Sequence, residues 1–171
     1  MVRVVVRFAA FALWLIAGGC GSESFTEIEK ERAPLIAGLE SYASRAEVLP
    51  KLTSGVATKV VEDIARNKDD SQPPHKVYAV KLLTYEHLRQ PGQLLLTFFN
   101  DRLMQVAFYP EKFDEYVAAL RASGVALRTG NELVVGHTTI WIGKDYDNVP
   151  FIGWADERLR AQQIRWLSKY S

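Results

Sequence analysis

The chain of 171 residues has one cysteine, two methionines and three histidines, and these scarcities limit its chemistry. A single cysteine excludes an intramolecular disulfide. The histidines, His75, His87 and His137, have no spacing that places two of them on one helical turn, and no His-Glu-x-x-His metal motif exists. Neither a glycine-rich phosphate loop nor a Gly-x-Ser-x-Gly elbow occurs. We therefore predict no catalytic residues, no metal site and no cofactor.

An excess of charge of one sign is also lacking, because the formal net charge is +1. No basic stripe runs along any segment, so nucleic acid is not an expected partner. Long apolar runs are lacking as well: the stretch from Phe8 to Gly19 has about a dozen residues, whereas a membrane span needs about 20. The hydrophobic content of 48% is instead typical of a folded globular protein.

The beginning of the chain has the features of an export signal. Arg3 and Arg7 lie before the apolar stretch that begins at Phe8, and small residues precede Cys20. Small residues followed directly by a lone cysteine resemble a bacterial lipobox, although Ala17 stands where that motif usually has leucine. The resemblance implies that residues 1–19 are a signal peptide and that Cys20 begins the mature chain with lipid on its sulfur. Ordinary secretion with an incidental cysteine and an uncleaved anchor are the alternatives.

The lipobox resemblance also implies a location and an organisation. We expect an exported protein, anchored in the bacterial envelope through acylated Cys20, on the outer membrane facing the periplasm. Gly21, rather than aspartate, after the cysteine is consistent with that sorting. The polar residues 20–33 are predicted to be a tether, and residues 34–171 are predicted to form a single domain.

Two helices are predicted at the start of the domain. Apolar residues from Leu35 to Ala46 recur at three-and-four spacing, which indicates a helix over residues 34–47 that ends before Pro50. The spacing of apolar residues from Val56 to Ile64 gives a second, shorter helical face, with Ser54 as its N-cap.

The residues after Pro74 have the composition of strands. Three segments rich in β-formers follow each other, Val77–Tyr85, Leu94–Phe99 and Leu103–Tyr109. Because turn residues separate them at 90–92 and at 100–101, a three-stranded antiparallel meander is predicted.

The second hairpin of this meander carries a more specific prediction. Phe98 and Phe108 are expected on the same side of the hairpin. A two-residue turn pairs Phe98 with Leu103, but strict alternation then puts Phe108 on the opposite face from Leu103. The two requirements agree only if the hairpin contains a bulge or a longer loop.

The rest of the chain is predicted to add a helix and further strands. We expect a helix over 111–122, one long strand over 133–142 and a strand over 149–154, while residues 157–170 fit either a strand or a helix. The fold class is then α+β, with N-terminal helices packed on an antiparallel meander and a further helix and strands after it. Residues 98–103 and 153–159 share the order aromatic, Asp, Arg, Leu, which is either a duplicated hairpin or a coincidence.

Part of the chain resembles a known family. The run Gly55-Val56-Ala57-Thr58-Lys59-Val60-Val61 is similar to the first helical motif of the SmpA/OmlA family of small envelope lipoproteins, with Val56 in place of its methionine. The closing Leu-Gly-x-Pro of that motif is absent. The resemblance covers about residues 54–110 and implies two helices on a three-stranded antiparallel sheet, and a role in assembling envelope complexes.

Three further features are candidates for a site. His137 lies in the predicted long strand, either as a ligand or base or as a half-buried histidine. Residues 145–148 alternate oxygen donors but lack the glycine and glutamate of a calcium loop, so they fit an ordinary polar turn. Trp141, Trp154 and Trp166 fall in the last third of the chain and serve either the core or an interface.

These features favour a non-enzymatic, lipid-anchored envelope protein that binds another envelope protein or helps to assemble a complex. The first alternative is a periplasmic carrier of a small molecule or lipid, with a pocket between helices and sheet. The second is a hydrolase whose site residues converge only in the fold.

Overall fold

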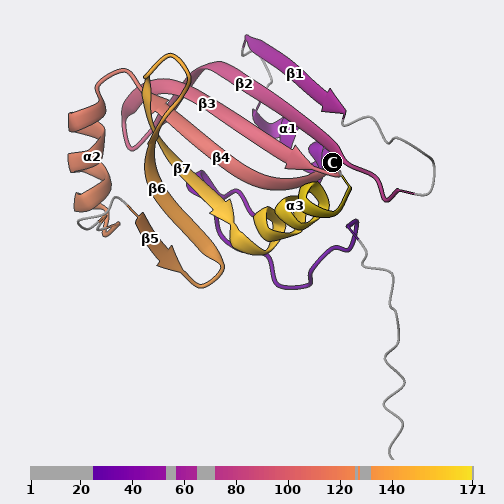
Figure 1. The fold of residues 1–171 in the computed structure, drawn as a ribbon. Coiled ribbons are helices and arrows are strands. Elements are labelled where there is room, and N and C mark those ends of the chain that lie inside the picture. Colours follow the sequence, from indigo (N-terminus) through magenta and orange to yellow (C-terminus); the bar gives the residue numbers. More distant parts are fainter. Residues whose placement is uncertain (1–24, 53–56, 65–71, 126, 128–131, 171) are drawn as a thin grey trace, which may run out of the picture.

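The computed structural model describes residues 25–52, 57–64, 72–125, 127 and 132–170, with side chains of 60–64 left aside. Its centre is a curled antiparallel sheet of seven strands in the order β1-β2-β3-β4-β7-β6-β5 (Figure 1). The strands are β1 (Thr58–Ile64), β2 (Lys76–His87), β3 (Gln90–Phe99), β4 (Arg102–Pro110), β5 (Glu132–Val135), β6 (Thr138–Lys144) and β7 (Pro150–Asp156). The helices are α1 (Arg45–Leu52), α2 (Phe113–Ala122) and α3 (Glu157–Tyr170), with a short 3-10 turn at Ile36–Gly38.

The prediction of an α+β fold with N-terminal helices packed on the sheet is wrong. Residues 58–64 form β1, an edge strand paired along its whole length with β2. This segment is rich in β-branched residues, and pairing with a long neighbouring strand outweighs its helical spacing. The helical motif that suggested the SmpA/OmlA resemblance is therefore extended from Thr58 onwards.

The other predicted N-terminal helix is also wrong over most of its length. Residues 34–44 form an irregular segment with a 3-10 turn, in which Ala37 has a left-handed backbone, and a second turn at Ser41-Tyr42. Pro34 bridges to Glu40 across the first turn. Helix α1 begins only at Arg45 and contains Pro50, which was expected to lie beyond it. Leu35 and Ile36 are buried although they belong to this irregular segment. Their burial therefore does not require the helix that their spacing suggested.

The meander is confirmed, but one of its turns lies elsewhere. Strands β2, β3 and β4 pair in sequence, and the β2–β3 turn is Leu88-Arg89 rather than 90–92. Gly92 belongs to β3, where a β-carbon would collide with the carbonyl of Tyr109 and the ring of Phe108 on β4. This glycine therefore permits a close approach of two strands and does not form a turn.

The predicted bulge in the second hairpin is confirmed. Asn100-Asp101 is a two-residue turn with positive φ at both residues, and the β3–β4 register shifts between Thr97 and Phe98. Because of this extra residue, Phe98 and Phe108 share one core with Leu103.

In the last third of the chain the helix over 111–122 and the strand over 149–154 are confirmed as α2 and β7. The long strand over 133–142 is wrong, since a turn at Gly136-His137 divides it into the hairpin β5–β6. The tail is helix α3, so of the two explanations for the order shared by 98–103 and 153–159, the duplicated hairpin, which needs a second strand after β7, is excluded.

The two faces of the sheet support two cores. The larger core lies on the face covered by the N-terminal segment, α1 and α2, and includes Leu96, Phe108, Tyr116 and Trp154. The smaller one lies on the other face beneath α3, which crosses in front of the strands in Figure 1 while α1 lies behind them. Helix α3 covers only one end of this second face. The part of the face that α3 leaves uncovered is the surface described below.

Candidate functional site

The N-terminal segment is clamped to the sheet by a buried arginine. Arg102, at the start of β4, is only 2% exposed. Its guanidinium donates to the carbonyl oxygens of Phe25 and Glu27, to the Gln162 side chain on α3 and to the Phe99 carbonyl. Burial lowers the pKa of this guanidinium, which nevertheless stays charged and makes strong hydrogen bonds. The chain is thus held in place from Phe25, well inside residues 20–33, which the sequence suggested to be a tether.

A second buried polar pair fixes the same segment further along. The Asp156 carboxylate, at the end of β7, is fully buried and accepts from the Ser41 hydroxyl at 2.7 Å and from Arg158 at 2.7 Å. The Ser41 hydroxyl in turn accepts from the Ala33 amide at 2.8 Å. Burial would raise the pKa of Asp156, but the hydrogen bonds from Arg158 and Ser41 hold it below its ordinary value.

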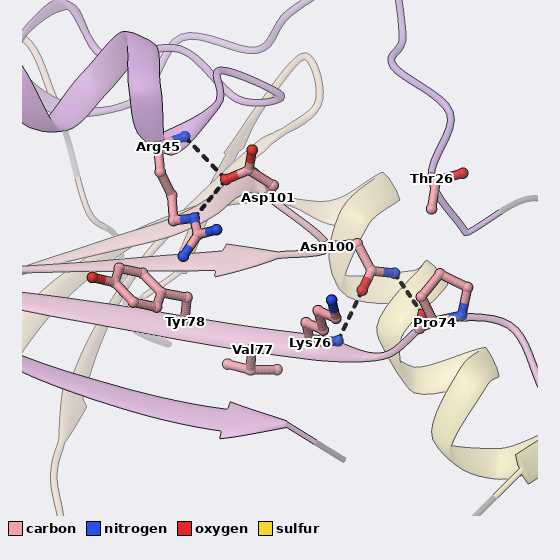
Figure 2. Close-up of a pocket in the computed structure, with 8 residues that line it drawn as sticks. All are labelled: Thr26, Arg45, Pro74, Lys76, Val77, Tyr78, Asn100 and Asp101. Atoms are coloured by element: carbon pink, nitrogen blue, oxygen red, sulfur yellow. Dashed lines mark hydrogen bonds and ion pairs between the residues drawn. The ribbon is translucent and has the colours of Figure 1, made fainter. Parts of the chain in front are cut away.

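A surface cavity of about 370 Å³ opens where this segment meets the sheet (Figure 2). Its lining residues are Thr26, Arg45, Pro74, Lys76, Val77, Tyr78, Asn100 and Asp101. The Asn100 side chain accepts from the Lys76 amide and donates to the carbonyls of Pro74 and Phe25. Asn100 therefore ties the β3–β4 turn to the start of β2 and to the clamped segment.

The other wall of this cavity is the start of α1. Arg45 Nε donates to Asp101 at 2.6 Å, and its guanidinium lies 4.4 Å from the centre of the Tyr78 ring (Figure 2). Arg45 and Asp101 are half-exposed, so this ion pair orients the helix more than it stabilises the fold. The cavity is open, and its polar groups are mostly engaged with each other.

The second candidate site is a row of aromatic side chains on the face that α3 covers only at one end. Tyr109 on β4 and Phe151 on β7 have ring centres 5.3 Å apart, and Trp141 on β6 meets Phe151 edge to face at 6.3 Å. Lys81 on β2 lies 4.5 Å from the Tyr109 ring, and Arg160 on α3 lies 5.1 Å from the Trp141 ring. We call these five residues the aromatic row. It crosses several neighbouring strands and ends in a cation on each side.

Two glycines allow the Trp141 and Phe151 rings to pack flat against the sheet. A β-carbon on Gly153 would collide with the Trp141 ring, and one on Gly143 would come 2.6 Å from the tip of the Phe151 ring. Each ring therefore leans across the glycine of the adjacent strand, an arrangement that compensates for the missing side chain. The three rings are partly buried by each other and remain partly open to solvent.

The three tryptophans proposed as interface residues lie in different places. Trp154 is 4% exposed in the larger core, and Trp166 is 2% exposed in the smaller core, with its indole donating to the Pro73 carbonyl. Only Trp141 is partly exposed, so it alone of the three can contact a partner on this surface. Tyr109, Phe151 and the two cations of the row were missed by sequence reasoning. Glycines inside the strands beside aromatics were the signal that could have found them.

The histidines do not come together. His137 lies exposed in the β5–β6 turn, so its expected place inside a strand is wrong. His75 is buried against Trp166 at a ring distance of 4.4 Å. His87 Nδ1 and the Tyr116 hydroxyl form a hydrogen bond of 2.7 Å in the larger core, where burial lowers the pKa of His87 and raises that of Tyr116. Within the described residues no carboxylate joins this pair.

The remaining candidates add no site. Asp145 accepts from the amides of Asp147 and Val149 and so closes a polar turn between β6 and β7. Among the residues that the structure describes, no group of three or more His, Cys, Asp or Glu side chains is placed to hold a metal ion. No described helix is long and apolar enough to cross a membrane. Cys20 lies outside the described residues. Neither a family model nor a curated protein matches the sequence.

Proposed function

We propose that this chain is a lipid-anchored protein of the bacterial cell envelope, on the outer membrane facing the periplasm, that binds another envelope protein through the aromatic row and catalyses no reaction. The observation that carries the binding proposal is the row itself. Three aromatic rings lie side by side across β4, β7 and β6 on a sheet face that the described helices cover only at one end. Anchoring rests on the lone Cys20 after a short apolar leader.

The chemistry of the row favours a protein partner. Aromatic residues and arginine are enriched where proteins bind each other, and aromatic side chains bury a large area with few rotatable bonds. Here the rings are held in place by the facing glycines, so little side-chain freedom would be lost on binding.

The charges at the two ends of the row define the kind of partner that fits it. Lys81 and Arg160 mark these ends, and each lies over an aromatic ring. Arg160 also forms an ion pair with Glu157 on the same helix at 2.9 Å, so the two ends differ in charge. A partner with an apolar centre and an acidic group opposite Lys81 is complementary.

A carrier function has less support. Four cavities along the described chain have volumes of about 370, 430, 470 and 550 Å³ and are lined in part by charged residues. The space between the sheet and the segments that cover its larger core is filled by packed side chains such as Leu96, Phe108 and Tyr116, which are fully buried. No observation therefore favours a lipid or small-molecule pocket.

The anchor and the docking surface are tested separately. Cys20→Ala should move the protein from the membrane fraction to the soluble fraction without changing its unfolding transition. The double variant Trp141→Glu, Phe151→Glu should stay on the membrane but lose the partner that co-purifies with the wild-type protein in mild detergent. Tyr146→Glu is the matched control, because Tyr146 is a fully exposed aromatic in the β6–β7 turn, outside the row.

Two results would contradict the proposal. Membrane association of the Cys20→Ala variant would exclude the lipid anchor. Equal recovery of the same partner with the double variant and with Tyr146→Glu would exclude the row as the docking surface, provided that both variants unfold cooperatively like the wild type.

A further inference from the structure

We infer that the corner formed by Phe25 and the end of α3 rests against the lipid bilayer that holds the acyl chains of Cys20, so that the domain is fixed close to the membrane surface. The inference rests on the anchoring part of the proposed function. It goes beyond that proposal because it names the membrane-facing surface and replaces a long tether with a short one.

Only a short length of chain separates the lipid-bearing residue from the fold. Phe25 is 1% exposed and its carbonyl accepts hydrogen bonds from both Arg102 and Asn100. Five residue steps separate Cys20 from Phe25, and five residues of fully extended chain span at most about 18 Å. A free tether of residues 20–33 would have reached about 45 Å by the same measure. The clamp therefore removes most of the reach that the sequence suggested.

The position of the clamp determines which surface of the domain faces the membrane. The Phe25 ring meets the Tyr170 ring edge to face, with centres 6.2 Å apart, so the chain leaves the fold beside the last turn of α3. In Figure 1, α2 lies at the opposite end of the molecule from this point. An anchor attached here keeps the end of α3 close to the bilayer, whereas α2 is free to lie further away.

The residues at this corner suit a membrane interface. The last turn of α3 carries exposed Leu167 and Lys169 beside the partly buried Tyr170. Ile28, three residues after Phe25, is 64% exposed and lies between the exposed carboxylates of Glu27 and Glu29. Lys169 lies 5.3 Å from the centre of the Tyr170 ring. Tyrosine and lysine place their apolar parts among lipid chains and their polar ends among headgroups, and exposed aliphatic side chains add apolar area that lipid can bury.

A depth measurement on the full-length lipidated protein tests this inference. The acylated Cys20 sulfur does not react with thiol probes, so a cysteine introduced at Lys169 or at Asp114 takes a single fluorophore. Asp114 is the matched control, an exposed charged residue in the first turn of α2. Both variants are reconstituted into phosphatidylcholine–phosphatidylglycerol vesicles that carry a nitroxide quencher on a fraction of the headgroups.

We expect the Lys169→Cys label to be quenched several-fold more strongly than the Asp114→Cys label. Insertion of twelve Gly and Ser residues before Phe25 should make the two labels nearly equal, because a flexible linker of that length frees the domain to turn. Equal quenching without the insertion would overturn the inference. Flotation of the same vesicles reports anchoring independently: protein that floats but shows equal quenching contradicts only the inference, and protein that does not float contradicts the anchor and the inference together.

Discussion

The indole ring of Trp141 lies directly over Gly153 on the paired strand β7, where any β-carbon would collide with it. Trp141 thus depends on the absence of a side chain on its neighbour to lie flat against the sheet. We expect Gly153→Ala to turn the indole away and expose it. The cost in stability should be small, about 1 kcal/mol, because a partly exposed ring can move.

Tryptophan fluorescence checks this first prediction. The emission of the Gly153→Ala variant should shift to longer wavelength and become more accessible to acrylamide. In a Trp141→Phe background the same glycine substitution should leave the emission of the buried Trp154 and Trp166 unchanged. A shift that persists in that background would show that the glycine supports the core and not the aromatic row.

The second prediction concerns the clamp. Arg102→Leu removes the charged hydrogen bonds to the carbonyl oxygens of Phe25 and Glu27 and to Gln162, and leaves the Phe25 carbonyl only its bond from Asn100, which should lower the free energy of unfolding by about 2–4 kcal/mol. Limited proteolysis should then cut the chain first between residues 25 and 33. Arg121→Leu, at an exposed position of α2, is the control and should change neither measurement. Unchanged protection of the N-terminal segment would contradict the role given to Arg102.

The third prediction is a dependence of stability on acid. The folded-state pKa of Asp156 lies below its value in the unfolded chain, which is about 3.9. The ionised carboxylate therefore stabilises the fold fully above that pH, and this contribution is lost as the pH falls through the lower folded-state pKa. Urea unfolding between pH 7 and pH 2 should show this loss. The Asp156→Asn variant should have a lower free energy of unfolding at pH 7, and that free energy should fall less steeply towards pH 2. An equally steep fall in Asp156→Asn would assign the effect to other carboxyl groups.

The fourth prediction follows from the β2–β3 turn. Leu88 and Arg89 both have positive φ, at 51° and 60°, a conformation that costs a residue other than glycine or asparagine about 1 kcal/mol or more. Because Arg89 is exposed, Arg89→Gly should raise the free energy of unfolding by about 0.5–1 kcal/mol. Arg121→Gly, in the regular helix α2, should lower it instead. A loss of stability in Arg89→Gly would show that the arginine side chain contributes more than the turn strain costs.

The strands in which apolar and polar residues alternate, or which are bounded by strong turn residues, could be predicted from the sequence. Asn100-Asp101 is polar, short and tolerant of positive φ, and the conflict between Phe98 and Phe108 required the bulge that the hairpin contains. The β2–β3 turn could not be found in this way, because Leu88-Arg89 has no turn composition and Pro91-Gly92 does. The strands on either side determine that turn, and they are paired up to His87 and Gln90.

The errors at the start of the domain have one physical origin. Three-and-four spacing of apolar residues measures which residues are buried, and a helix is only one way to bury them. Leu35 and Ile36 are buried within an irregular segment, because the hydrogen bond between Ser41 and Asp156 holds that segment against the end of the sheet. Those hydrogen bonds join positions more than a hundred residues apart, which no local pattern reveals. The aromatic row was missed for the same reason, since it depends on the order of strands in the sheet.

The central claim is that the aromatic row binds another protein of the envelope, and site-specific photo-cross-linking in intact cells tests it most directly. A photoreactive phenylalanine analogue is placed at Tyr109, Trp141 or Phe151, and at Tyr146 as the exposed control outside the row. We predict that all three row positions give an adduct of the same mass with one protein in the membrane fraction and that Tyr146 does not. Adducts from Tyr146 equal to those from the row, or none from any row position, would contradict the account.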